Sequence, residues 1–542
     1  MGSLSAIDYA IVLLYLAATT VVGLWVSVYV RTGREFFLAG RTLPWWAVGL
    51  SLVATDIGGT DLIGVGGAAY RHGLAVGNFE WIGCVPAMIV AAFVFIPHFW
   101  RCGVTTIPEF LERRFDVKVR TAVALCWLAF MACNLGVMLL ASAKLMDALA
   151  GWPVPLTIGL VAALVCFYTW TGGLAAVVYT DVLQGIVMIA GCVLVVIVGL
   201  WNVGGWTSLE QRVEQQVESR ELSVESQTST PSSITLNSQP STLNPPRFEH
   251  FSLVLPVDTS SPFPWTGILF GLALVISPAY WIGNQAIVQR ALGARSEYEA
   301  KASYVWGALL KNVIPLVIAV PGLIALAKFP GLTGPETDKA LPLLIGETMP
   351  LGLKGVFVAA FLAALMSSID SYLSSAATIV TNDFYLRFMR PTADERRVLR
   401  IGRMVTIALT VWAIAFAWHL SRYETGIYTI FQTLIAFFNG PAFAVLLTGL
   451  VFKSANRYGA LAGFIGGVVT AVSLFLLNHP ALYERFEWRP LFQIQDPYLY
   501  FSVWAFLVSL AVIGSVSYAT KPDPSEKQQF ALGNMPSAGD AA

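Results

Sequence analysis

The stretch LVATDIGGTD, residues 52–61, places two adjacent glycines and two carboxylates in the middle of an apolar run that extends over 44–70. A run of about 20 mostly apolar residues is long enough to span a bilayer. In lipid, an unpaired backbone group costs several kcal/mol, so irregular backbone survives only where it lines a cavity. The stretch therefore predicts a membrane helix that is interrupted near its middle, beside a polar pathway.

A second apolar run, 264–290, is interrupted at a comparable depth. It contains VISPAYWIG, residues 275–283, in which a proline is followed by a glycine. Each interrupted run is the first of five consecutive apolar runs, and the two sets cross the membrane in opposite directions. Glycine and proline are common in membrane helices, but inverted repeats with corresponding broken helices are typical of transporters that bind their cargo at the midplane. The matching positions favour a transporter.

The composition indicates that most of the chain lies in lipid. Of its 542 residues, 56% are hydrophobic and 12% are charged, whereas soluble domains carry roughly 25% charged residues. The net charge of zero gives no reason to expect a nucleic-acid partner, and the six cysteines show neither metal-binding nor disulfide spacing. We expect an all-α polytopic membrane protein with about thirteen transmembrane helices, at 7–30, 44–70, 78–99, 119–149, 153–170, 176–202, 264–290, 303–327, 352–385, 399–420, 426–452, 457–478 and 498–518.

Lysine and arginine are concentrated in alternate loops, which predicts an outside N-terminus and, with an odd number of spans, a cytoplasmic C-terminus. The loop 203–262 has a centre of Ser, Thr, Gln, Asn and Pro, and it is expected to be disordered, like the tail. The expected segments are a first flanking helix at 1–43, a first five-helix repeat at 44–202, the extracytoplasmic polar loop at 203–262, a second five-helix repeat at 264–452, flanking helices at 453–520 and a cytoplasmic tail at 521–542.

Seven residues stand out among the polar residues inside these runs, because a charge at the centre of a bilayer costs at least ~2.5–3.5 kcal/mol. So many are more consistent with one shared aqueous pathway than with separate accidents. Glu80 and Asp181 lie near the ends of their runs, so contact with water outside the membrane accounts for these two equally well. The seven are Asp56, Asp61, Glu80, Asp181, Lys311, Asp370 and Gln432.

Two adjacent serines, Ser367 and Ser368, lie in the apolar run 352–385. Serines in a helix usually bond back to a carbonyl of the preceding turn and do nothing else. A hard cation such as sodium, however, prefers oxygen ligands. Two hydroxyls that face the freed carbonyls of a broken helix would supply such ligands without a fixed charge, so the pair is a candidate cation site.

Several motifs, taken in order, resemble the sodium/solute symporter family, and within it the sodium/glucose cotransporter branch. The resemblance covers about 35–450 and implies the leucine-transporter-type fold, an inverted five-helix repeat with flanking helices. The motifs are FFLAGR (36–41), GLSLVATDIGG (49–59), GNFEW (77–81), TIPEFLERRF (106–115), TGGLAAVVYTDVLQ (171–184), YWIGNQAIVQRALGA (280–294), AALMSSIDSYLSSAATIVTNDFY (363–385) and FQTLIAFFNGPAFAV (431–445).

The resemblance implies a sodium site made by backbone carbonyls and two hydroxyls. Its residues would be Ala54, Ile57, Ala364, Ser367 and Ser368. Some members hold a second sodium at the aspartate that matches Asp181. Asp370 stands where sugar-transporting members often have threonine or another small residue, so it would strengthen a second cation site or bind a proton.

The resemblance also implies a sugar site, with an aromatic inner gate at Tyr280 beside Trp281. Asp56 replaces a family asparagine, and Asp61 replaces a histidine or glutamine. Two carboxylates would suit an amino sugar better than a neutral sugar, unless Lys311 pairs with one of them. The implied substrate residues are Asp56, Asp61, Glu80, Ser277, Tyr280, Trp281, Lys311 and Gln432.

Together these features predict a sodium-coupled symporter of the cell membrane that works by alternating access, with Na⁺ as coupling ion and no other cofactor. A hexose such as glucose or galactose is the leading solute, and inositol, an amino sugar, an amino acid or a carboxylate are alternatives. A sodium-gated sensor or channel of the same fold is a further alternative. An enzyme is not expected, because HExxH, GxSxG and Cys/His clusters are absent from the sequence.

Overall fold

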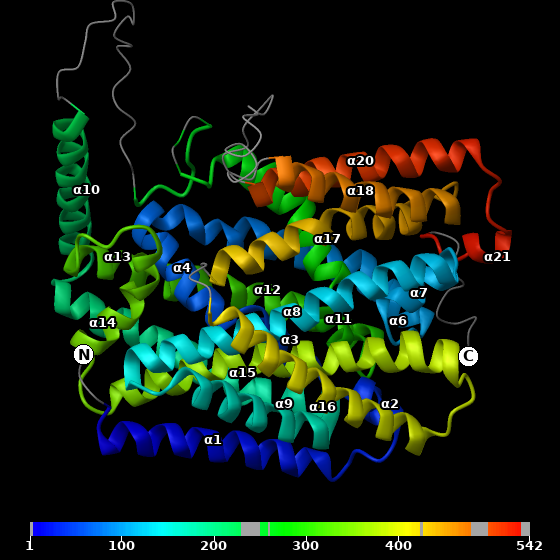
Figure 1. Cartoon of the computed structure of the whole chain (residues 1–542), viewed down its shortest axis with the longest axis horizontal. Helices are drawn as coiled ribbons and strands as arrows, with labels where there is room; N and C mark the ends of the chain where they lie inside the picture. Colours follow the sequence, from blue (N-terminus) through cyan, green and yellow to red (C-terminus); the bar gives the residue numbers. More distant parts are fainter. Residues whose placement is uncertain are drawn as a thin grey trace, which may run out of the picture.

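The computed structural model describes residues 4–228, 250–257, 259, 261–422, 427–477 and 497–532. Within these ranges the secondary structure is helical, and the β contacts are two isolated bridges. Figure 1 shows most helices side by side with roughly parallel axes, with α1 (Ala6–Ser27) along one edge and α20 (Pro497–Ala519) along the other. Helix α1 begins at one end of this bundle, and α21 (Ser525–Gln528), the last described helix, lies at the other.

The remaining helices fall into two groups along the chain, with 3₁₀ and π segments labelled η. The first group is α2 (Gly33–Leu38), η1 (Ala39–Arg41), α3 (Trp45–Asp56), α4 (Gly59–His72), η2 (Gly73–Gly77), η3 (Phe79–Cys84), α5 (Val85–Val90), η4 (Ala91–Phe95), α6 (Ile96–Cys102), α7 (Ile107–Arg114), α8 (Val117–Ala150), α9 (Val154–Val203) and α10 (Trp206–Thr228). The second group is η5 (Gly267–Ile276), η6 (Ala279–Gly283), α11 (Gln285–Leu292), α12 (Glu297–Lys311), α13 (Ile314–Lys328), η7 (Gly334–Lys339), α14 (Ala340–Thr348), α15 (Leu353–Ile379), η8 (Val380–Met389), α16 (Glu395–Leu420), α17 (Ile427–Val451), α18 (Arg457–Leu477) and α21 (Ser525–Gln528).

The described residues contain nine helices that are long and apolar enough to cross a membrane, or up to eleven if each of two bent pairs is one span. The predicted number of thirteen is therefore not confirmed. One reason is α9, which covers two predicted spans and is kinked at Gly173 (φ 53°, ψ −149°). A Cβ at Gly173 would lie 2.4 Å from the carbonyl oxygen of Phe36, so only glycine fits this joint.

The first predicted break is present. Helix α3 ends at Asp56, Ile57 leaves the helical region (φ −86°, ψ 85°), and α4 starts at Gly59 with its axis turned by 57°. A Cβ on Gly59 would lie 2.4 Å from Cγ of Leu365 in α15. The glycine therefore lets the broken segment pack directly against α15, the helix that carries the serine pair.

The second break lies at Asn284, slightly beyond the predicted proline–glycine interruption. The chain bends by 50° between η6 and α11. Asn284 adopts an extended conformation (φ −73°, ψ 117°), and its side chain accepts a hydrogen bond of 3.0 Å from the amide of Ala286. This is an N-cap, which starts a new helix. Pro278 instead lies between the π-helical segments η5 and η6, whose wider turns accommodate a residue without an N–H.

The two broken helices are joined to each other at one end. Leu43, just before α3, donates its amide to the carbonyl of Gly293 (3.2 Å), and the amide of Arg295 donates to the carbonyl of Leu43 (3.1 Å). Gly293 and Arg295 directly follow α11. The start of the first broken helix and the end of the second therefore share one short β bridge.

The region 203–262, predicted to be a disordered polar loop, begins with helix α10. Apolar residues at spacings of four, Leu209, Val213 and Val217, form one face of this helix, and the first two are buried. This face packs against α9 and α13. The sequence did not reveal this apolar face, because Gln, Glu and Ser dominate the composition of the segment. Residues 229–249 of the predicted loop lie outside the described residues.

The tail was also predicted to be disordered, and its first part is instead docked on the helix ends; we call residues 521–532 the C-terminal strap. Ala531 is fully buried, and Phe530 and Leu532 pack against the core. The strap contacts four elements: Asp523 pairs with Arg457 (2.6 Å), Lys527 donates to the carbonyl of Glu112 (3.0 Å), the carbonyl of Phe530 bonds His98 (2.8 Å), and the amide of Leu532 donates to Leu450 (2.7 Å). Three consecutive apolar residues and these polar contacts together hold the strap.

Truncation after Thr520 is expected to lower the unfolding temperature of the purified protein in detergent. It removes the partly buried Phe530 and Leu532 and the Asp523–Arg457 pair, a loss of about 2–4 kcal/mol. The matched control is truncation after Leu532, which keeps the strap and is expected to leave the unfolding temperature unchanged. Equal unfolding temperatures for the two truncations, measured by scanning fluorimetry, would contradict a docked strap.

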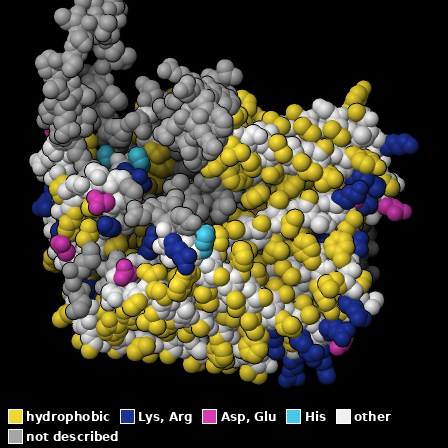
Figure 2. All heavy atoms as spheres, viewed as in Figure 1, with side chains coloured by type: hydrophobic (Ala, Val, Ile, Leu, Met, Phe, Trp, Pro, Cys, Tyr) yellow, Lys and Arg dark blue, Asp and Glu magenta, His cyan; other side chains and the backbone are white. Residues whose placement is uncertain are grey.

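The surface of the bundle is that of a membrane protein. Figure 2 shows hydrophobic side chains over a wide band of the visible face, with Lys and Arg gathered at the end where α2, α7 and the start of α16 lie. Large exposed apolar residues such as Leu14, Phe93, Val411 and Val469 are distributed over different helices. Such a band is costly in water and favourable in lipid.

Candidate functional site

The serine pair of α15 meets the end of α3 at the first break. Ser367 Oγ donates to the carbonyl of Ala54 (2.7 Å), and Ser368 Oγ donates to the carbonyl of Thr55 (2.9 Å). The last carbonyls of a helix have no partner within it, and the break leaves those of α3 free for the serines. Both hydroxyls also reach the carbonyl of Ala364, at 3.0 and 3.2 Å.

This arrangement gathers backbone and hydroxyl oxygens in a buried place. Ala54, Ala364, Ser367 and Ser368 are fully buried and are linked by these hydrogen bonds. Thr55 joins them, although the sequence pattern did not single it out. Ile57 lies at the break itself, and among the described residues it has no hydrogen bond to either serine. The carbonyl oxygens are uncharged, and the serine hydroxyls can rotate their hydrogens away from a bound ion. Such a set of ligands suits a small monovalent cation.

A buried ionic network lies one helical turn further along α15. Asp181 of α9 pairs with Arg290 of α11 (3.2 Å) and accepts a hydrogen bond from Ser51 of α3 (2.6 Å). Arg290 also donates to Ser51 (2.7 Å) and to Ser371. Asp181 and Arg290 are both fully buried. The sequence did not single out Arg290, because the pattern of Lys and Arg does not distinguish the last turn of a buried helix from a loop.

Asp370 belongs to the same network but does not touch Asp181. It accepts hydrogen bonds from Tyr168 (2.7 Å) and Ser371 (3.1 Å), and Ser371 in turn contacts Thr55 (3.0 Å). One oxygen of Asp181, Oδ1, has no hydrogen-bond partner among the described residues. The two carboxylates are therefore linked through Ser371 and Arg290 rather than placed face to face. Tyr168 was missed, because an aromatic residue in an apolar run carries no sequence signal.

Lys311 lies between two carboxylates in the second polar cluster. It forms ion pairs with Asp56 at the end of α3 and with Glu80 in η3. The lysine side chain is fully buried, and those of Asp56 and Glu80 are 12% and 10% exposed. Its Nζ lies 5.8 Å from the ring centroid of Trp281. Lys311 therefore pairs with Asp56, one of the two carboxylates that favour a cationic solute, and its second partner is Glu80 rather than Asp61.

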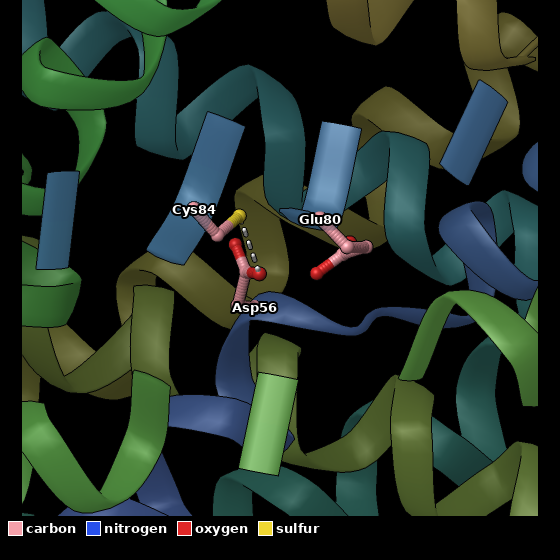
Figure 3. A group of neighbouring side chains, drawn as sticks. All are labelled: Asp56, Glu80 and Cys84. Carbon is pink, nitrogen blue, oxygen red and sulfur yellow. Dashed lines mark hydrogen bonds between the residues drawn. The ribbon is translucent and has the colours of Figure 1, made fainter. Parts of the chain in front are cut away.

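Cys84 also belongs to this cluster, which the sequence did not anticipate. Its Sγ lies 3.9 Å from Oδ2 of Asp56, and Figure 3 shows Cys84 and Asp56 turned toward each other with Glu80 alongside. The spacing of four residues from Glu80 puts Cys84 on the same helical face, which was the available signal. Asp56, Glu80 and Cys84 have ligand atoms within 4.8 Å of one another. Because the ammonium group of Lys311 already pairs with both Asp56 and Glu80, we interpret the group as an ion-pair cluster and not as a metal centre.

The other predicted substrate residues lie around this cluster. Asp61 accepts a hydrogen bond from the amide of Gly58 (2.9 Å) and so caps α4. Ser277 lies against Gly83, where a Cβ would come within 2.8 Å of its hydroxyl. The ring of Tyr280 packs edge-on against Trp281, with centroids 5.8 Å apart. The side chain of Gln432 lies outside the described residues.

A further ionic network lies at the basic end of the bundle. Asp383 of η8 accepts a hydrogen bond from Thr106 (2.8 Å) and pairs with Arg120. Glu112 of α7 pairs with Arg120 (2.6 Å) and with Arg387 (2.7 Å). Burial acts to raise the pKa of Glu112, but hydrogen bonds from Arg387 and Arg120 outweigh it and hold that pKa below its ordinary value. The network joins α7 and α8 to η8.

Comparison with known proteins places these features in a family. The sequence pattern of the sodium:solute symporter family matches residues 36–467. The chain is 30% identical to human sodium/glucose cotransporter 4, covering 97% of this chain and 77% of that protein. It is 32% identical to the sodium/mannose cotransporter of Bos taurus, covering 97% and 88%.

Among solved structures, the chain is similar to a substrate-bound, outward-open Na⁺-coupled sialic acid symporter. The TM-score is 0.75 at 22% identity, covering 96% of this chain and 99% of that one. This likeness extends over nearly the whole length of both proteins. It confirms the predicted leucine-transporter-type fold.

Proposed function

The chain belongs to the sodium:solute symporter family, and from that premise we propose that it imports a sugar such as glucose or galactose together with Na⁺. Sodium-coupled transport of a small solute follows from the family and from its sodium/glucose cotransporter relatives. The identity of the solute and the residues that hold it are the proposal.

The observation that carries the sugar is the cluster of Lys311, Asp56 and Glu80 beside Trp281. Carboxylate oxygens accept hydrogen bonds from hydroxyl groups, and an ammonium group donates to them. An aromatic face packs on the apolar side of a sugar ring. The relatives named for glucose and mannose transport support the same class of solute.

A cationic solute such as an amino sugar is the second candidate. Asp56, Glu80 and Asp61 together carry three carboxylates against the one ammonium group of Lys311. The capping position of Asp61 weakens this case, because the positive end of the α4 dipole already balances part of its charge. An anionic carboxylate solute is disfavoured by the same excess of negative charge, whereas inositol remains compatible with it.

In the proposed cycle, Na⁺ binds to the oxygens of Ala54, Ile57, Ala364, Ser367 and Ser368 and fixes the broken first helix against α15. This completes the solute site, and the loaded bundle then opens to the cytoplasm, where Ser367 and Ser368 separate from α3. The ion drives the change by its different affinity for the two states. One charge crossing 100 mV and a tenfold Na⁺ gradient together supply about 3.7 kcal/mol, enough for a roughly 500-fold solute gradient.

We include a second cation at Asp181 and Asp370 in the proposal. It is supported by the free Oδ1 of Asp181 and by the position of Ser371, which connects the two carboxylates to the serine pair. The ion pair with Arg290 already neutralises part of the charge of Asp181. The side chain of Arg290 must therefore move before a second ion can bind. The proposed orientation has the N-terminus outside and the basic end, with the C-terminal strap, in the cytoplasm.

Counterflow in proteoliposomes tests the solute. Vesicles preloaded with a high concentration of unlabelled glucose are expected to accumulate labelled glucose transiently, in the presence of Na⁺ only. The panel includes galactose, mannose, myo-inositol, glucosamine, an amino acid and a carboxylate. Counterflow with glucosamine but not with glucose would show that the solute is a cationic sugar and not a neutral one. Equilibration without accumulation against a gradient would favour a channel.

A further inference from the structure

An apolar groove lies on the membrane-facing side of the bundle, between the first half of α9 and α16. It has a volume of about 330 Å³, and its walls include Cys166, Phe167 and Trp170 from α9 and Ile407, Val411 and Ile414 from α16. Phe167, Ile407 and Val411 are 45%, 47% and 60% exposed. Thr410, also in the wall, donates its hydroxyl to the carbonyl of Thr406, so it presents no free donor.

The groove ends beside an arginine. The guanidinium of Arg403 lies 5.4 Å from the ring centroid of Trp170. It donates to the carbonyls of Trp170 (3.1 Å) and Thr171 (3.2 Å), just before the kink of α9 at Gly173. The arginine therefore marks the border between the apolar groove and the basic end of the molecule.

Two more arginines continue the line of the groove along α16. Arg396, Arg400, Arg403, Ile407, Val411 and Ile414 are separated by three or four residues, so they share one face of the helix. Arg396 and Arg400 are exposed. The neighbouring acid, Glu395, accepts a hydrogen bond from the amide of Arg34 (3.3 Å) and is thereby turned toward α2. Figure 2 shows the resulting cluster of Lys and Arg at the end where α16 starts.

We propose that this groove binds one anionic membrane phospholipid. An acyl chain lies along Phe167, Ile407 and Val411, and the phosphate group meets Arg403 and the exposed Arg400 and Arg396. The apolar part fits a hydrocarbon chain better than a polar ligand, because apolar side chains make up most of the wall and the hydroxyl of Thr410 is already bonded to the carbonyl of Thr406. The charged part selects the head group, since guanidinium groups bind phosphate in two-point contacts and arginines near a membrane surface attract anionic lipid.

The test measures lipid binding to the purified full-length protein in detergent by native mass spectrometry, with phosphatidylglycerol and phosphatidylcholine as probes. The wild-type protein is expected to bind one phosphatidylglycerol more tightly than phosphatidylcholine. Arg396→Gln and Arg400→Gln together are expected to weaken phosphatidylglycerol binding roughly 30-fold, about fivefold per arginine. Arg403 is left unchanged because it also holds the backbone of α9.

Arg422→Gln is the matched control, since Arg422 is exposed just beyond the opposite end of α16. It is expected to leave lipid binding unchanged. A second variant, Cys166→Trp, fills the groove without changing the charge and is expected to weaken phosphatidylglycerol binding as well. Equal binding of the two lipids, or equal losses in Arg422→Gln and in the double variant, would overturn the proposal in favour of unspecific attraction. Unaltered phosphatidylglycerol binding in Cys166→Trp would show that the lipid does not occupy the groove.

Discussion

Ser368→Ala is expected to raise the Na⁺ concentration needed for half-maximal solute uptake by roughly 10- to 100-fold. The hydroxyl of Ser368 joins α15 to the carbonyl of Thr55 at the end of α3, in the place proposed for the ion. An ion–hydroxyl contact in a buried site contributes about 1.5–3 kcal/mol. The alanine has no oxygen to replace the lost hydroxyl.

The measurement is uptake of labelled sugar into proteoliposomes as a function of external Na⁺. The matched control is Ser375→Ala, two helical turns further along the same face of α15. Ser375 is buried like Ser368, and its hydroxyl has no hydrogen-bond partner among the described residues. Its loss is expected to leave the Na⁺ dependence unchanged. Equal Na⁺ dependence in both variants and in the wild type would show that the ion is bound elsewhere.

Lys311→Met is expected to abolish measurable sugar binding, with a loss of roughly 10²–10³-fold in affinity. Methionine keeps much of the length of the side chain but removes the charge that holds Asp56 and Glu80 together. Removing one partner from a buried ionic group costs about 3–5 kcal/mol, because the other charges remain without compensation. The two carboxylates are then expected to repel each other and separate the end of α3 from η3.

Lys301→Met is the control on the same helix, since Lys301 pairs with Glu297 (2.7 Å) but its side chain is 33% exposed. Surface pairs contribute at most about 1 kcal/mol, so sugar binding is expected to persist. A third variant distinguishes binding from folding: Lys311→Met combined with Asp56→Asn and Glu80→Gln removes all three charges. It is expected to recover thermal stability, measured by scanning fluorimetry, without recovering sugar affinity. Recovery of both thermal stability and sugar affinity would show that Lys311 does not contact the solute directly.

The broken helices and the polar residues between them could be predicted from the sequence, because lipid makes both features conspicuous. The glycine pair at 58–59 and the charge of Lys311 are costly inside an apolar run unless they line a polar pathway. What could not be predicted depends on contacts between distant segments. The partner of Asp181 is Arg290, 109 residues away. Local composition likewise gave no sign that the strap would dock through Phe530, Ala531 and Leu532.

The position of the second break shows the same limit on a smaller scale. Proline and glycine are the strongest local signals of an interruption, yet the chain stays helical at Pro278, between η5 and η6, and the bend occurs at Asn284. The deciding interaction is the hydrogen bond from the amide of Ala286 to the side chain of Asn284. An N-cap of this kind can be recognised in a sequence only when the start of the next helix is already known.

The bridge between Leu43 and the residues after α11 has a consequence for the timing of the two halves. Because backbone hydrogen bonds hold the first broken helix to the second, neither can tilt by itself without breaking them. In the proposed cycle the two broken helices are therefore expected to move together. Coupled movement would disfavour an intermediate in which one helix has turned and the other has not, and with it the leakage of ions without cargo.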